Sequence, residues 1–305
     1  MNGVVEVVRA GALTTVQDAG RIGWAHLGVP RAGALDAPAR RLANRLAGNG
    51  ADAAVLETTV TGCAVRPDRP VVAVVGGAPC RVTVDGRPVA WGAPVRVPAG
   101  AVLDAGPAVR GLRSYLAFGG GLLPEPVLGS RSADLLSGLG PAPLRDGDVL
   151  PLGPAPAGLP GADAVPWPGG AAAELVLPLH LGPRHTWFTD EALRTLTTAE
   201  YRVSAHSNRI GLRTRGPALT RAREGELPSE GMVLGAVQVP PDGRPVVFLN
   251  DHPTTGGYPV VGVVHETALA GAAQAVPGTR VRFVCAGRPA GRPAGRSGTG
   301  ARPLP

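Results

Sequence analysis

The chain has 305 residues, of which 44% are hydrophobic and 17% charged, and its formal net charge is +7. This composition excludes a disordered chain and predicts a folded protein of about two domains that buries roughly three-quarters of its extended-chain surface. All 30 basic residues are arginine. Schiff-base lysine catalysis, a Walker-type phosphate-binding lysine and a biotinylated lysine are therefore excluded on this chain.

The positive charge does not indicate a nucleic-acid partner. Four arginines stand in a Gly- and Pro-rich tail without acidic residues, Arg288, Arg292, Arg296 and Arg302. The rest of the chain is only weakly positive and contains no basic block or basic stripe with interleaved aromatic residues. We therefore expect neither nucleic-acid binding nor a basic membrane-binding face.

Targeting and redox signals are also weak. The three cysteines form no Cys-x-x-Cys pair, and the six histidines show no metal-ligand spacing, so neither a disulfide framework nor a metal site is expected. The first residues contain no basic and apolar leader, and no apolar run is long enough to span a membrane. The expected location is the cytoplasm.

The composition changes once along the chain. Residues 141–170 are crowded with Pro, Gly and Ala and show no periodicity, so they are expected to link a domain at 1–140 to a domain at 171–287. Residues 288–305 are expected to be a disordered basic tail. Both domains contain short Val-rich runs separated by turn residues, the pattern of antiparallel barrels or sandwiches. Two tandem closed β-barrels with a few short helices are predicted.

Two helix starts interrupt this β pattern. Asp36 precedes Ala37 and Pro38, which is typical of an N-cap followed by a first-turn proline, and Gly48 would end that helix. In the second domain Thr189 caps a predicted helix at 190–196. Both helices are expected to be short.

The most informative segment runs from Gly235 to Pro259. Two Val-rich strands flank Pro-Pro-Asp-Gly, which predicts a hairpin with Gln238 and Asp251 near one end of a sheet. The loop that follows, Thr-Thr-Gly-Gly-Tyr, offers hydroxyls, open backbone N–H groups and an aromatic ring to a ligand. Its candidate contact residues are Thr255, Gly256, Gly257 and Tyr258. The alternative is a Gly-rich turn that is needed only for its geometry.

Other polar residues could contribute to the same surface. Gln17 and Arg21 stand on a Gly-punctuated segment, where Asp18 and Arg21 could instead pair with each other. Arg209 and Arg213 are guanidinium groups four residues apart and suit a carboxylate. No Gly-x-Ser-x-Gly nucleophile motif is present. These residues predict a binding surface for a small anionic or amide substrate, not a self-contained catalytic centre.

Several segments in order resemble the Kip-A / allophanate hydrolase subunit 2 family, which is related to biotin-dependent carboxyltransferases. The resemblance covers residues 4 to about 285 and rests on 14–23, 28–36, 56–59, 127–136, 204–216, 228–231 and 235–259. It departs from the family at Asn208, where an aspartate is usual, and at His252-Pro253, where another polar pair is usual.

The resemblance implies two tandem cyclophilin-like barrels and a non-autonomous subunit. Its expected partner is a Kip-I-like B-type subunit, and the A, B and C components of the prokaryotic 5-oxoprolinase together couple ATP hydrolysis to the opening of 5-oxo-L-proline to L-glutamate. ATP would be used by the complex, with no recognisable site on this chain. One alternative is the carboxyltransferase component of a urea or amide carboxylase, with biotin on another chain. Another is a non-catalytic regulator that binds a Kip-I-like kinase inhibitor.

Site roles follow from this resemblance. Asp251 and Gln238 are expected to be catalytic, and the Thr255–Tyr258 loop would hold the amide. Arg209 or Arg213 would bind the substrate carboxylate, and Gln17 and Arg21 would complete the wall of the site.

Overall fold

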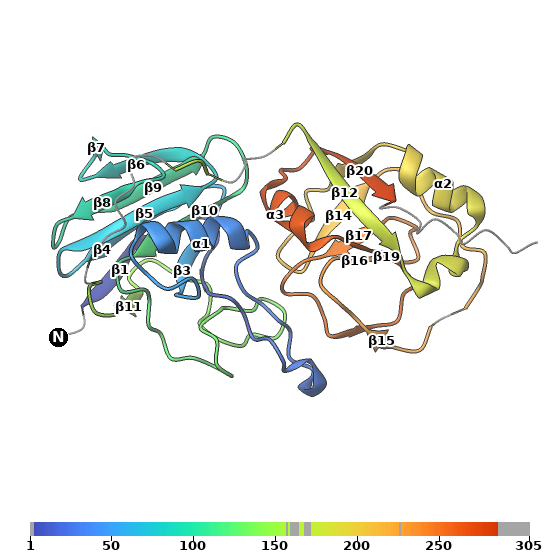
Figure 1. The fold of residues 1–305 in the computed structure, drawn as a ribbon, viewed down its shortest axis with the longest axis horizontal. Coiled ribbons are helices and arrows are strands. Elements are labelled where there is room, and N and C mark those ends of the chain that lie inside the picture. Colours follow the sequence, from blue (N-terminus) through green and yellow to red (C-terminus); the bar gives the residue numbers. More distant parts are fainter. Residues whose placement is uncertain (1–2, 157, 159–164, 168–171, 226, 286–305) are drawn as a thin grey trace, which may run out of the picture.

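Both halves of the chain fold around β-sheets, and they lie side by side along the long axis of the molecule (Figure 1). The computed structural model describes residues 3–156, 158, 165–167, 172–225 and 227–285. The first half holds strands β1 to β11, and the second holds β12 to β20. The mainly β class predicted from the sequence is confirmed. The predicted disordered tail, 288–305, lies outside the described residues.

Two antiparallel sheets make up the first half. One has the strand order β11-β1-β4-β9-β6-β7, and the other has the order β2-β3-β10-β5-β8. The strands of the first sheet are β1 (Val4–Arg9), β4 (Cys63–Pro67), β6 (Cys80–Val84), β7 (Arg87–Pro88), β9 (Leu103–Ala108) and β11 (Val149–Pro151). Those of the second sheet are β2 (Thr14–Gln17), β3 (Val55–Thr59), β5 (Val71–Gly77), β8 (Pro94–Val97) and β10 (Arg113–Phe118).

Strand β10 is buried along its whole length because both faces of its sheet are covered. Leu116 and Phe118 join the core between the two sheets. Tyr115 and Ala117 belong to a second core under helix α1 (Ala37–Leu46), which packs on β5 and β10. The three layers are therefore sheet, sheet and helix.

Helix α1 begins as the sequence predicts. Asp36 is its N-cap, and the Asp36 carboxylate accepts a hydrogen bond from the Ala39 N–H at 3.0 Å. Pro38 lies in the first turn, where its missing N–H costs nothing. Gly48 follows the last turn with a φ of 78°, a conformation that favours glycine.

The second half is a closed barrel with the strand order β12-β19-β16-β17-β14-β13-β20. Its neighbours pair antiparallel except β12 and β20, which run parallel and close the barrel. The strands are β12 (Glu174–Leu181), β13 (Tyr201–Val203), β14 (Gly211–Arg215), β16 (Ala236–Gln238), β17 (Val246–Phe248), β19 (Val260–Val264) and β20 (Arg280–Cys285). The predicted hairpin is present as β16 and β17, joined through Pro240–Gly243.

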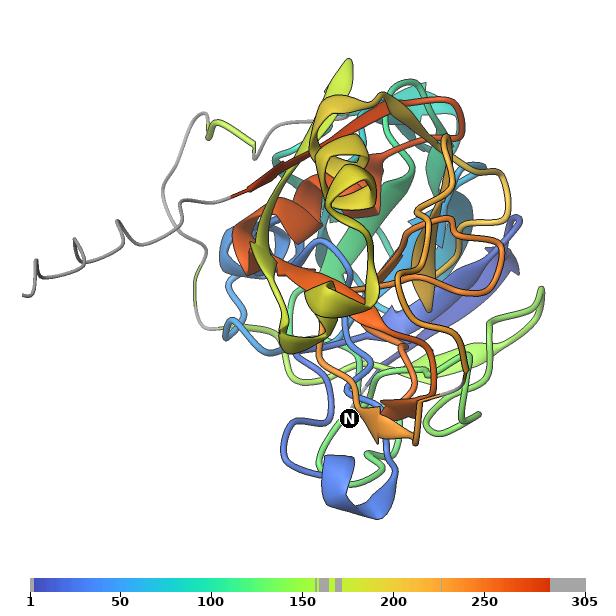
Figure 2. The same cartoon turned by 90° about the vertical axis from the view of Figure 1, so that its right-hand side faces the viewer.

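The two halves also contain several short elements outside the three large sheets. They are α2 (Asp190–Thr198), α3 (Glu266–Gln274), the 3-10 turns η1 (Ala25–Leu27) and η2 (Pro183–Trp187), and a small sheet of β15 (Glu230–Gly231) and β18 (Thr255–Gly256). Helix α2 is capped by Thr189 as predicted. In both views η1 projects on the side of the molecule where β15 and β18 lie (Figures 1 and 2).

The structure differs from the sequence-based expectation in three places. The first half consists of two packed sheets instead of a second closed barrel, since alternation shows which strand faces are buried but not which strand edges pair. Part of the expected linker 141–170 is folded, because β11 pairs with β1 and Leu144, Leu150 and Leu152 enter the core. Helix α3 was not predicted.

Candidate active site between the two halves

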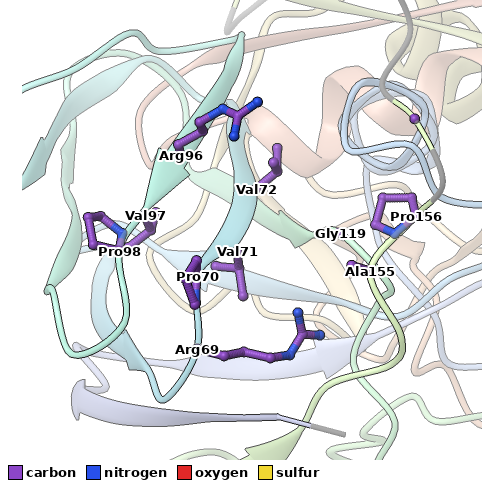
Figure 3. Close-up of a pocket in the computed structure, with 11 residues that line it drawn as sticks. Arg69, Pro70, Val71, Val72, Arg96, Val97, Pro98, Gly119, Ala155 and Pro156 are labelled. Carbon is purple, nitrogen blue, oxygen red and sulfur yellow. The ribbon is translucent and has the colours of Figure 1, made fainter. Parts of the chain in front are cut away.

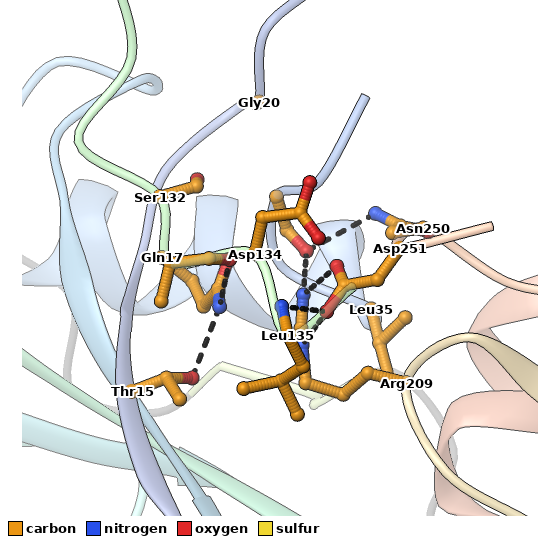
Figure 4. A network of polar contacts seen from close by, with 12 residues as sticks. Thr15, Gln17, Gly20, Leu35, Ser132, Asp134, Leu135, Arg209, Asn250 and Asp251 are labelled. Carbon is orange, nitrogen blue, oxygen red and sulfur yellow. Dashed lines mark hydrogen bonds and ion pairs between the residues drawn. The ribbon is translucent and has the colours of Figure 1, made fainter. Parts of the chain in front are cut away.

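A buried network of polar side chains joins the two halves, and Arg209 lies at its centre (Figure 4). The Arg209 guanidinium donates from Nε and Nη2 to the two carboxylate oxygens of Asp251, each at 2.9 Å. It also donates from Nη1 to Glu57 on β3 and from Nη2 to the Gly33 carbonyl at 2.7 Å. Because Glu57 and Gly33 belong to the first half, this one side chain ties the barrel to the sheets.

A second set of hydrogen bonds crosses the same boundary at the end of α3. The Gln274 side chain donates to the Asp36 carboxylate at 2.9 Å and to the Arg113 carbonyl at 3.0 Å, and it accepts from the Arg113 N–H at 3.0 Å. Tyr115 donates its hydroxyl hydrogen to Glu57 at 2.9 Å, which connects this set to the Arg209 network. The two halves are therefore held in one arrangement by satisfied buried groups.

The charges in the network stabilise one another. Burial alone would lower the pKa of Arg209, but the adjacent carboxylates of Glu57 and Asp251 outweigh burial and raise it. Burial raises the pKa of Asp251 above its usual range, and the Arg209 charge opposes this shift. Arg209 is thus a permanent cation that is 1% exposed, and its partners occupy its hydrogen-bonding groups.

Arg209 was expected to bind the substrate carboxylate, and in this structure its side chain is committed to protein groups. Its Nε, Nη1 and Nη2 atoms all donate to such groups, and Asp251 is 0% exposed. Both residues therefore join the two halves of the chain. The sequence could not show this, because the partner Glu57 stands 152 positions away from Arg209.

A cleft lined by both halves contains two adjacent cavities of about 260 Å³ each. They share Ile22, Arg31 and Leu234. We call the first the helix-side pocket, since it is lined by residues of α1 and α3; its charged lining residues are Asp18, Arg31, Arg40, Arg41, Asp52 and Glu266. We call the second the loop-side pocket; its polar lining residues are Arg21, Arg31, His252 and Thr254.

The loop-side pocket contains two arginines but no acidic lining residue among those described. Arg21 is 2% exposed and donates from Nε to the Val127 carbonyl at 3.1 Å and from Nη2 to the Ser132 carbonyl. Its Nη1 and the Nε of Arg31 are buried without a hydrogen-bond partner in the described structure. Buried donors of this kind are uncommon in folded proteins.

His252 supplies a different kind of group to the same pocket. Its ring stacks on Phe248 with centroids 5.8 Å apart, and its Nδ1 lies 2.7 Å from the Pro253 carbonyl. Since a carbonyl oxygen only accepts, Nδ1 carries the proton and Nε2 carries the lone pair. Burial lowers the pKa of His252, which keeps the ring neutral at pH 7.

Asp18 does not pair with Arg21, which was one expectation from the sequence. The Asp18 carboxylate accepts hydrogen bonds from the hydroxyls of Ser130 and Ser132, both at 2.6 Å, and from the backbone N–H groups of Gly20 and Arg131. Burial would raise the pKa of Asp18, but these hydrogen bonds outweigh it and lower the pKa. The carboxylate therefore stays ionised and fixes the loop that carries Arg21.

The remaining predicted site residues are spread around the cleft. Gln17 is fully buried and donates to Thr15 at 3.0 Å and to the Ala133 carbonyl at 3.1 Å. Gln238 donates to the Tyr258 carbonyl at 3.3 Å, behind the β18 loop. Exposed and partly exposed residues of that loop are Thr255, Gly256, Gly257 and Tyr258. Thr254, one position earlier, is the loop residue that lines the loop-side pocket.

Arg213 does not join the cleft. It is exposed and lines a shallow cavity of about 860 Å³ on the barrel, together with Arg215, Arg244 and His206. A further cavity of about 600 Å³ lies on the first half (Figure 3). Its lining consists of two arginines, Arg69 and Arg96, and of several valine and proline residues. Neither of these two cavities is built by both halves, whereas the cleft is, and so is a third cavity of about 820 Å³ that is lined by Gly111 and Leu112 of the first half and by Pro277 and Gly278 of the second.

Sequence reasoning missed one residue of the site and left the role of another open. Arg31 lies within a segment that carries only the family resemblance, and nothing in its neighbours distinguishes it from a surface arginine. His252 is a histidine inside a candidate loop, with no role that the sequence alone assigns. The one signal that could have indicated a role for His252 is its position directly after Asp251, because the buried network holds Asp251 in place.

Comparison with known proteins agrees with this architecture. The family of the carboxyltransferase domain, subdomain A and B, matches residues 27–285. The chain belongs to this family. It is 37% identical to the C subunit of 5-oxoprolinase from Escherichia coli, over 92% of this chain and 91% of that protein. It is also 31% identical to the urea amidolyase of Saccharomyces cerevisiae, over 92% of this chain but only 16% of the relative.

Solved structures share the fold. The crystal structure of TTHA0988 superposes with a TM-score of 0.84 at 38% identity, covering 92% of this chain and 56% of that one. The urea carboxylase of Kluyveromyces lactis also gives a TM-score of 0.84, at 30% identity, and the match covers 92% of this chain and 27% of that one. The chain thus spans about half of one structural relative and about a quarter of the other.

Within the described residues, no helix combines the length and apolar character that a membrane span needs. The same residues contain no group of three or more His, Cys, Asp and Glu side chains that is placed to hold a metal ion.

Proposed function

We propose that the chain is the C-type component of an ATP-dependent 5-oxoprolinase and that it acts with the A-type and B-type components to open 5-oxo-L-proline to L-glutamate. The observation that supports this most directly is the 37% identity to the C subunit of a bacterial 5-oxoprolinase along almost the whole of both chains. The urea amidolyase relatives are far longer than this chain. The name of the bacterial relative marks it as one subunit of a larger enzyme, which supports a role with companion chains.

The geometry supports a binding role for this chain. An unactivated lactam is a poor electrophile, so phosphorylation of its oxygen by ATP would supply both a leaving group and the driving force. The chain has no lysine and hence no Walker-type loop, and its residues offer no recognisable fit to the nucleotide. We therefore assign ATP to the companion chains. This chain would hold the lactam in the cleft, where rigid walls lower the entropy cost of reaction.

Reconstitution with the A-type and B-type components from the same source tests the proposal. The expected result is 5-oxoproline-dependent ADP release that requires all three chains. Leu234 lines both pockets of the cleft, so Leu234→Trp should reduce turnover at least tenfold, because the added volume fills the ligand space. The matched control is Leu181→Trp, at an exposed position on the barrel.

The outcomes of this assay discriminate between the candidates. Absence of 5-oxoproline-dependent ADP release from the complete mixture would contradict the proposal. Biotin-dependent bicarbonate exchange in its place would favour a carboxyltransferase component, which the urea amidolyase relatives support as the second candidate. Complex formation without either activity would indicate a regulatory protein. If Leu234→Trp and Leu181→Trp give equal 5-oxoproline-dependent ADP release, filling the cleft has no effect on turnover, and the cleft is excluded as the substrate site.

A further inference from the structure

Arginine side chains stand side by side on the outer face of the barrel. Arg202 on β13 lies directly opposite Arg280 on β20 and directly opposite Arg215 on β14. Opposite residues of an antiparallel pair point to the same face of a sheet, and all three side chains are exposed. The residues that flank Arg202, Tyr201 and Val203, point the other way, into the core of the barrel.

The row continues onto β17 at Arg244. The Thr214 N–H donates to the Pro245 carbonyl at 3.2 Å, in the register that pairs β14 with β17, and this register brings Arg215 level with Arg244. Arg244 is exposed and lines the barrel cavity of about 860 Å³ together with Arg215 and Arg213. We call the exposed arginines of β13, β14 and β20, together with Arg244, the arginine row.

Most of the charge of the arginine row is not neutralised within the described structure. Glu200 is shared between Arg202 and Arg280, and it lies 3.5 Å from the Arg280 Nε. The three arginines that line the cavity form no ion pair with any described residue. Like charges that lie directly opposite each other destabilise a sheet. The row therefore lowers the stability of the isolated barrel, and an anion laid across it would remove this cost.

The other polar groups of the cavity do not supply that anion. Asn208 lines the cavity, and its Oδ1 accepts from the N–H groups of Ile210 at 2.9 Å and Gly211 at 3.2 Å, so its Nδ2 group remains as a donor. Asp242 is the one acidic lining residue among those described, and its carboxylate accepts from the Arg244 N–H at 3.1 Å within its own turn. The cavity thus presents mainly donors, which match the acceptor-only oxygens of carboxylates.

We propose that the arginine row docks a short acidic segment of another protein chain, whose carboxylates pair with Arg213, Arg215 and Arg244. A guanidinium group holds a carboxylate through two parallel hydrogen bonds, and clusters of arginines are a recurrent means of recognising acidic segments. The proposal does not depend on the proposed function, because the row lies on the barrel and outside the cleft.

The length of the row fits a peptide segment. Neighbouring strands lie about 4.8 Å apart, so arginines on four adjacent strands extend over about 14 Å. An extended segment of about five residues presents its alternate side chains over a similar length. Three carboxylates on one face of such a segment would therefore reach the whole row.

The surroundings of the row disfavour a nucleic acid. Acidic residues stand at both ends, since Glu174 on β12 is the register partner of Arg280 and Asp242 adjoins Arg244. These carboxylates would repel the phosphates of a strand that continued past the row. The described lining of the cavity also contains no Phe, Tyr or Trp on which a base could stack.

Peptide binding to the isolated full-length chain tests the proposal. The probe is a fluorescein-labelled hexaglutamate peptide, with binding measured by fluorescence anisotropy at fixed ionic strength. A hexaglutamine peptide and a dT oligomer of equal length serve as comparison probes. Hexaglutamate should bind roughly tenfold or more tightly than hexaglutamine, which lacks the charge, and it should also bind more tightly than the oligomer.

Two triple variants separate the arginine row from the overall net charge. The row variant combines Arg213→Gln, Arg215→Gln and Arg244→Gln and should bind hexaglutamate roughly tenfold or more weakly. The matched control combines Arg81→Gln, Arg87→Gln and Arg194→Gln, three exposed arginines elsewhere on the molecule, and should lose less than about twofold. All six positions are exposed, so circular dichroism should show the native fold in both variants.

Asn208→Asp tests the site without removing an arginine. The new carboxylate can still accept from the N–H groups of Ile210 and Gly211, so the turn is kept while a negative charge enters the cavity. Hexaglutamate should bind this variant about threefold more weakly.

Four results would overturn the proposal. Equal weakening in the two triple variants would show that only net charge attracts the peptide, and equal affinity for hexaglutamate and hexaglutamine would show that the row does not recognise carboxylates. Tighter binding of the dT oligomer, lost in the row variant, would assign the row to a nucleic acid. Self-association in light scattering that disappears in the row variant would assign it to a second copy of this chain.

Discussion

At the scale of single residues, hydrogen-bond partners and not burial separate the side chains that build the site from those that can face a ligand. Arg209, Asp251 and His252 are all buried, but Arg209 and Asp251 are mutually paired, whereas His252 keeps an unpaired ring nitrogen at the cleft, among the described residues. The sequence assigns Arg209 and Asp251 to one candidate site but gives no measure of which polar group already has a hydrogen-bond partner. Hydrogen-bond partners from the other half of the chain decide that distinction.

His252 should make stability depend on pH. The imidazole has a pKa below its ordinary value of 6.5 in the folded chain, because burial disfavours the charged form. As pH falls through 6.5 the unfolded chain takes up this proton before the native chain does. The free energy of unfolding should therefore fall as the pH is lowered from about 7.5 to about 5 in the native chain, and part of this loss should vanish in His252→Phe.

Urea unfolding at the two pH values measures this effect. The relevant quantity is the difference between native chain and variant, since carboxylates also titrate near the acidic end. His206→Phe, which removes an exposed imidazole, is the matched control. An identical pH dependence for His252→Phe and the native chain would contradict the burial argument.

At the scale of elements, local signals in the sequence located most helices and strands. The Asp36 and Thr189 caps and the Pro240–Gly243 turn each depend on residues within a few positions, and all three are found. Helix α3 was missed because its N-cap is His265, an unusual capping residue, and because its Ala-rich sequence shows little contrast between polar and apolar faces. Residues 14–17 form β2 although the sequence gives no apolar alternation at Thr14 and Thr15 that would predict a strand.

The two helix caps should differ in energetic weight. Thr189→Ala removes one hydrogen bond at an external helix and should lower the free energy of unfolding by about 1 kcal/mol. Asp36→Ala also leaves one of the two amide N–H groups of Gln274 without an acceptor, so it should cost at least about 2 kcal/mol. Denaturant unfolding of both variants makes the comparison, and equal losses would show that the contact between Asp36 and Gln274 adds nothing.

At the scale of the whole molecule, the halves are united by charges that only the folded chain brings together. Glu57 lies on β3 and Arg209 and Asp251 lie on the barrel, so no local pattern could reveal their contact. The alternation of apolar and polar residues likewise indicated strands in both halves but could not distinguish a closed barrel from two packed sheets. The sequence alone does not show which strands pair across long distances along the chain.

Removing the central cation should destabilise the arrangement of the two halves. Arg209→Met would leave Asp251 as an uncompensated buried acid and Glu57 with Arg113 as its one remaining cationic partner in the described structure, and should cost about 3–5 kcal/mol. The double change Arg209→Met and Asp251→Asn should recover part of this loss, since it removes the unpaired carboxylate and keeps the pair of Glu57 and Arg113. Thermal and urea unfolding measure both, and a double variant less stable than the single one would contradict this account.

The parallel pairing of β12 with β20 has a consequence for biosynthesis. Because β20 also pairs with β13, the barrel cannot close until residues 280–285 have left the ribosome. The Arg209 network needs that finished barrel, whereas β1 to β11 need only earlier residues. A nascent chain stalled shortly before residue 280 should thus carry a protease-resistant first half beside a still-cleavable second one.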